Sequence, residues 1–120
     1  MELARLYNYI YQQSDKRYTI IHNLDGYDEI SLTADFRYVH NGIEKSLSPE
    51  DMGYERAREK ELLGGKNVKE AVDIFLRILE GKGTKVQQDV VTINTQFALK
   101  CYYYRIEVHL QCRNGSLAFG

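Results

Sequence analysis

The dipeptide Asn41-Gly42 is the feature that most constrains the fold of this chain, because it separates two strand-like runs, 36–40 and 43–47. Both residues tolerate the positive φ angles that a two-residue type I′ hairpin turn requires. A short apolar run at 18–21 is typical of a further, buried strand. The sequence therefore predicts a small sheet built from this strand and the 36–47 hairpin.

Three segments show the apolar periodicity of amphipathic helices: 1–13, 67–80 and 84–101. In the second, Asn67 can cap the helix with Glu70 three residues later. Thr84 can cap the third. The apolar faces comprise Leu3, Leu6, Tyr7 and Ile10; Val68, Ala71, Val72, Phe75 and Leu79; and Val86, Val90, Ile93, Phe97 and Cys101. We therefore expect the α/β class, as a partial α/β domain with helices packed on a small mixed sheet and a β-hairpin.

Length and charge limit the classes of function. A chain of 120 residues forms one domain at most. Its 16 basic and 17 acidic residues give a formal net charge of -1, so composition predicts neither a nucleic-acid partner nor a membrane surface. No apolar run reaches the roughly 18 residues of a membrane span, and no signal-peptide core is evident, so we expect a cytoplasmic protein. Cys101 and Cys112 are then most simply free thiols, although a disulfide stays open.

The loop after the first strand carries the sharpest candidates for chemistry. Asp25, Asp28 and Glu29 surround Gly26 there. A strand that delivers carboxylates into a glycine loop is how α/β folds present ligands for hard cations to a phosphate substrate. Adjacent Asp28 and Glu29 can bridge or chelate magnesium, whereas Asp25 more simply shapes the turn. The alternative is that all three acids face solvent or cap backbone N–H groups.

Other polar residues receive structural interpretations, and we assign no catalytic residue. His22 ends the strand and is a conceivable general base, but a hydrogen-bonded histidine at a strand end is the interpretation we favour. Gly64-Gly65 lacks the further glycines of a phosphate cradle and is expected to set the start of a helix. Asn94 lies beside the apolar face of the last helix, where we expect it to act as a structural clamp.

Several segments resemble those of the anthranilate phosphoribosyltransferase family, and they occur in the family's order over residues 1 to about 103. Residues 22–31 are similar to its His-x-Leu-Asp-Gly-x-Asp-Glu-Ile-Ser segment, and residues 47–53 to its Leu-Thr-Pro-Glu-Asp-Phe-Gly segment. Gly64-Gly65 matches its Gly-Gly-Asp, with Lys66 replacing the aspartate. Residues 90–99 match its Val-x-x-x-Asn stretch.

The resemblance implies a glycosyltransferase that moves phosphoribose from phosphoribosyl pyrophosphate to anthranilate in tryptophan biosynthesis. It also implies that Asp28 and Glu29 bind the cofactor Mg²⁺ on the phosphoribosyl pyrophosphate substrate. In the family, a helical domain forms the homodimer, and upstream segments carry the glycine-rich pyrophosphate loop and a Lys-His-Gly-Asn motif. None of these is found here. We therefore expect a C-terminal piece of the α/β domain, with an open sheet edge, marginal stability and no activity alone.

Residues 104–120 form an atypical tail. Positions 104–112 alternate like a strand and depart from the family pattern, whereas 116–120 again resemble the family's Ser-Leu-x-Ser-Gly. A reading-frame slip with its reversal and a natural strand insertion explain this equally well. Two other functions also stay open: a non-catalytic α+β interaction or regulatory domain with a solvated acidic loop and, more weakly, a nucleoside phosphorylase of related fold.

Overall fold

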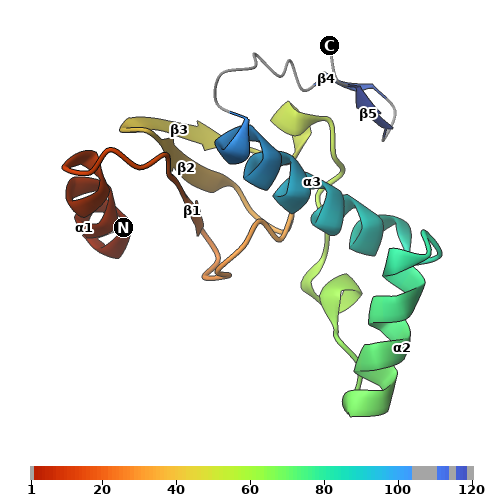
Figure 1. Cartoon of the computed structure of the whole chain (residues 1–120). Helices are drawn as coiled ribbons and strands as arrows, with labels where there is room; N and C mark the ends of the chain where they lie inside the picture. The colour runs from red at the N-terminus through yellow and green to blue at the C-terminus, as the bar shows by residue number, and fades with distance from the viewer. Residues whose placement is uncertain (1, 104–110, 114–115, 119–120) are drawn as a thin grey trace.

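The computed structural model describes residues 2–103, 111–113 and 116–118, and Figure 1 shows their arrangement. The main sheet has the order β1-β2-β3 and contains β1 (Thr19–Asn23), β2 (Phe36–His40) and β3 (Ile43–Leu47). The helices are α1 (Glu2–Gln12), α2 (Val68–Leu79) and α3 (Lys85–Tyr102), with the 3-10 turns η1 (Glu50–Met52) and η2 (Glu59–Leu62) before α2. A small sheet together with helices confirms the α/β class and the partial-domain architecture.

The predicted hairpin is present with the predicted turn. Asn41 has a φ of 48° and Gly42 a φ of 86°, so both adopt the positive values that the turn requires. Phe36 pairs with Leu47 across the hairpin, and β1 pairs with the other edge of β2. All described pairs are antiparallel, so the mixed sheet that we expected is not observed. The order of the strands leaves β1 and β3 as the two edges of this sheet.

Helix α3 lies across the sheet and forms the core with it (Figure 1). The Phe97 ring makes edge contacts with the rings of Phe36 and Tyr38, at centroid distances of 5.6 and 5.0 Å. Ile93 has no exposed surface. Val86 and Val90 pack partly buried against the same core. The predicted apolar face of this helix is therefore confirmed.

Helix α2 has the predicted ends but not the expected burial. The Asn67 side-chain oxygen accepts a hydrogen bond from the Glu70 N–H at 2.9 Å, and Gly81, with a φ of 74°, follows the helix. Its apolar stripe is nevertheless exposed, by 59% at Phe75 and 66% at Leu79. In Figure 1 α2 extends away from the sheet. Among the described residues no second layer covers this stripe, and the core against the sheet is formed by α3 and loop residues without α2.

Helix α1 lies beside β1 and is attached to the body through its aromatic side chains. The Tyr11 ring stacks on the Tyr18 ring at 5.4 Å, and the Tyr18 hydroxyl donates to Asn8 Oδ1 at 2.7 Å. Leu3, Leu6 and Ile10 on the predicted apolar face are more than half exposed. We expected three helices to cover the sheet. Among the described residues, only α3 packs its apolar face against it.

The tail is described only in part. Strands β4 (Gln111–Arg113) and β5 (Ser116–Ala118) pair antiparallel with each other. Most of the strand predicted at 104–112 lies outside the described residues, as does the side chain of Cys112, whereas Cys101 is a half-buried free thiol. The frameshift hypothesis stays a prediction. None of the described helices is both long enough and apolar enough to span a bilayer.

Candidate functional site

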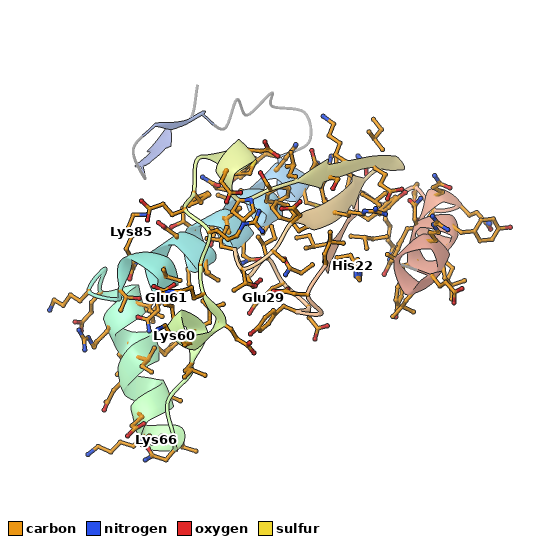
Figure 2. All side chains as sticks on the ribbon, turned by 180° about the vertical axis from the view of Figure 1, so that it is seen from behind. His22, Glu29, Lys60, Glu61, Lys66 and Lys85 are labelled. Carbon is orange, nitrogen blue, oxygen red and sulfur yellow. The ribbon has the colours of Figure 1, made fainter. Side chains whose placement is uncertain are left out.

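The loop between β1 and β2 holds the acidic residues that the sequence singled out. Asp28 and Glu29 are exposed, whereas the next residue, Ile30, has no exposed surface at all. Figure 2 shows Glu29 between His22 of β1 and the Lys60–Glu61 pair of η2, as seen in that view. The two adjacent carboxylates therefore stand at the surface directly beside a residue that is fixed in the core.

A network of side-chain hydrogen bonds holds the first half of this loop. The Asn23 amide at the end of β1 donates to the Asp25 carboxylate and to Ser31 Oγ, the latter at 2.8 Å. The Thr33 hydroxyl donates to the second oxygen of Asp25. Gly26 has a φ of 91°, and its N–H donates to the Asn23 carbonyl at 3.3 Å. Asp25 therefore shapes the turn, as expected.

Asn23 itself is fully buried, and its Oδ1 has no hydrogen-bond partner among the described residues. A buried polar atom without a partner normally costs free energy. The amide orientation is nevertheless determined, because its nitrogen faces the Asp25 carboxylate and an oxygen there would be repelled.

The second half of the loop is held by Asn94 of α3. Asn94 Oδ1 accepts from the Ile30 N–H at 3.0 Å, and its Nδ2 donates to the Ile30 carbonyl at 2.8 Å. The same Nδ2 donates to the Val90 carbonyl of α3 at 2.9 Å. The predicted structural clamp is therefore confirmed, and its target is the residue that follows Glu29.

Tyr27 and Glu59 form a contact that sequence reasoning missed. The Tyr27 hydroxyl forms a hydrogen bond with the Glu59 carboxylate, and partial burial together with the charges of Glu59 and Asp25 raises the pKa of Tyr27 above its usual value. This contact ties the tip of the loop to η2. No sequence signal identified it, because Glu59 lies in a charged stretch without periodicity.

The donor set suits a cation that a substrate helps to bind. Within the part of the chain that the structure describes, no group of three or more His, Cys, Asp and Glu side chains is placed to hold a metal ion. Mg²⁺ usually takes one or two protein carboxylates and completes its shell with water and substrate phosphates. Asp28 and Glu29, two adjacent oxygen donors on an anchored loop, fit that requirement.

The remaining candidates are placed as follows. His22 is half-buried on β1 and, with Asp28 and Gly26, borders an open cleft of about 470 Å³ between α1 and β1. Gly65 has a φ of 88°, and an added Cβ would lie 2.8 Å from the Glu70 Cβ. Gly65 thus allows the chain to pass close to the first turn of α2, which fits the expectation that the Gly64-Gly65 pair sets the start of this helix.

Comparison with known proteins supplies the family. The family model described as "Glycosyl transferase family, a/b domain" matches residues 1–104. The anthranilate phosphoribosyltransferase of Cytophaga hutchinsonii is 46% identical over 99 residues, covering 82% of this chain and 30% of that protein. The enzyme of the same name from Bacteroides fragilis is 46% identical over 100 residues, covering 83% and 30%. The chain thus spans about 30% of the length of these relatives.

Proposed function

The chain belongs to the glycosyl transferase family defined by this a/b domain, and from that premise we propose that it carries the metal-binding loop of an anthranilate phosphoribosyltransferase. The proposed reaction forms a bond between the anthranilate nitrogen and ribose C1 and breaks the bond from C1 to pyrophosphate. The observation that carries the proposal is the exposed pair Asp28 and Glu29, anchored on both sides, in a chain 46% identical to relatives of that name.

Within that reaction, this chain's part is to supply oxygen ligands. Asp28 and Glu29 would hold Mg²⁺, which when bound stabilises the charge that builds on the pyrophosphate leaving group. The two carboxylates would hold the ion in a defined position, because Asn23, Asp25 and Asn94 hold their loop in place. No residue of this chain is assigned to binding anthranilate, so we expect the 120-residue chain alone to form no product.

A chimaera tests the proposal. The segment of the Cytophaga hutchinsonii relative that matches this chain is replaced by the segment from this chain, and product formation is followed over a range of Mg²⁺ concentrations. Asp28→Asn keeps the side-chain shape but removes the charge, so we expect turnover to fall on the order of 10²-fold and the Mg²⁺ requirement to rise. Asp73→Asn, an exposed acid on α2, is the charge-matched control and should leave both unchanged.

Two results would contradict the proposal. Normal Mg²⁺ dependence in the Asp28→Asn chimaera would show that Asp28 is not a Mg²⁺ ligand. If the chimaera folds but forms no product, the proposal that this segment comes from an active anthranilate phosphoribosyltransferase is wrong.

The exposed apolar faces of α1 and α2 favour a second candidate, a non-catalytic interaction domain. It predicts that Asp28→Asn changes nothing, whereas substitutions on those faces abolish partner binding. The first proposal also includes that the complete enzyme is a homodimer and that it acts in the cytoplasm.

A further inference from the structure

We propose that Asn94 is a positioning residue, whose carboxamide sets the direction in which Asp28 and Glu29 present their carboxylates to a divalent cation. The inference rests on the proposed function, because it concerns how the same loop binds its ion. It assigns to α3 a part in the metal site without any direct contact between α3 and the metal.

The geometry begins at Ile30, which follows Glu29 directly. Its side chain has no exposed surface, and the residue lies outside every described strand. Both of its backbone groups are instead taken by the Asn94 carboxamide, at 3.0 Å for the N–H and 2.8 Å for the carbonyl. Without Asn94 these two backbone groups would lose their partners next to the core, which costs free energy.

The carboxamide is itself held in place. An asparagine side chain has two N–H donors and one oxygen acceptor. One donor reaches the Ile30 carbonyl, the other the Val90 carbonyl at 2.9 Å, and the oxygen takes the Ile30 N–H. Two hydrogen bonds therefore tie the backbone after Glu29 to α3, and the third fixes the carboxamide on α3 itself.

The other side of the acid pair is held independently. Asp25 accepts hydrogen bonds from the Asn23 amide and the Thr33 hydroxyl, three residues before Asp28 in the sequence. The two carboxylates thus lie between two fixed points, one on β1 and one on α3. Loss of the α3 anchor leaves the loop held by Asn23 and by the Tyr27–Glu59 contact but frees the backbone next to Glu29, and binding an ion then requires this backbone to be ordered first.

The test uses the 120-residue chain and Mn²⁺, an ion that accepts the same carboxylate and water ligands. Free Mn²⁺ is measured by electron paramagnetic resonance, and the site is located by Mn²⁺ broadening of backbone amide signals. Asn94→Leu removes all three bonds at similar volume, and Asn94→Ala is the second variant if the leucine prevents folding. The matched control is Tyr54→Phe, which removes a buried hydrogen bond to Gln96 Oε1, 3.2 Å long, on the same helix and in the same core, and none of the three bonds that Asn94 makes.

We expect Mn²⁺ to broaden the amides around Asp28 and Glu29 in the unaltered chain. Loss of a residue that orients metal ligands typically lowers metal affinity by roughly 10- to 100-fold, and we expect a decrease of that size in the Asn94 variants. Tyr54→Phe should stay within about two-fold of the unaltered chain, because it leaves both hydrogen bonds from Asn94 to Ile30 in place.

Three results would overturn the inference. An unchanged affinity in the folded Asn94 variants refutes positioning while leaving the proposed function intact. An equal loss in Tyr54→Phe shows a general loosening of the core and also refutes it. If the unaltered chain binds no Mn²⁺ at Asp28 and Glu29, the proposed metal site itself fails and the inference falls with it, a result seen before any variant is made.

Discussion

Replacement of Ile93 by valine tests whether α3 packs on the sheet as described. Ile93 has no exposed surface and lies in the core with Ile30 and Phe36. The substitution removes one buried methylene group, whose transfer to water costs about 0.8 kcal/mol. The cavity left behind adds to this, and Ile→Val changes in cores typically cost 0.5–1.5 kcal/mol. We therefore expect a loss of about 1 kcal/mol, which for a domain of this size lowers the melting temperature by about 4 °C.

The assay is urea and thermal unfolding, followed through the helical circular dichroism signal at low protein concentration. Val91→Ala is the matched control, because Val91 is on the same helix but 44% exposed. A surface change of this kind stays within about 0.5 kcal/mol. If Ile93→Val destabilises the chain no more than Val91→Ala does, the packing of α3 against the sheet is wrong.

Two further predictions concern the surface and acid pH. Phe75→Glu, on the exposed stripe of α2, should reduce self-association in light scattering without lowering the melting temperature, and unchanged particle size would show that another face drives association. The hydrogen bond from Arg56 lowers the pKa of Glu50, so this carboxylate contributes stability above its usual pKa of about 4.3 that is lost as pH falls through the lower value in the folded protein. Arg56→Gln should make the loss of stability between about pH 5 and 2 shallower, and an unchanged slope in acid unfolding would contradict this pairing.

Much of the local structure could be predicted because the interactions responsible lie within a few residues in the sequence. Asn41-Gly42 specified the hairpin turn through its tolerance of positive φ. Thr84 and Gln87 form reciprocal hydrogen bonds that begin α3, as the threonine alone had indicated. The apolar periodicity around Ile93 predicted the buried face of α3, and the residues of the acidic loop were identified with the resemblance to the family.

Only the tertiary structure decided which apolar surfaces are covered and how the acidic loop is held. The stripe of α2 has the same periodicity as that of α3, yet it is exposed, because periodicity shows that a face is apolar and not what packs on it. The antiparallel pairing of β1 with β2 likewise depends on which strand edges meet in space. Asn94 reaches Ile30 across 64 positions of sequence, and Tyr27 reaches Glu59 on η2. Such contacts depend on the path of the whole chain, because residues far apart in sequence meet only after the core between them has formed.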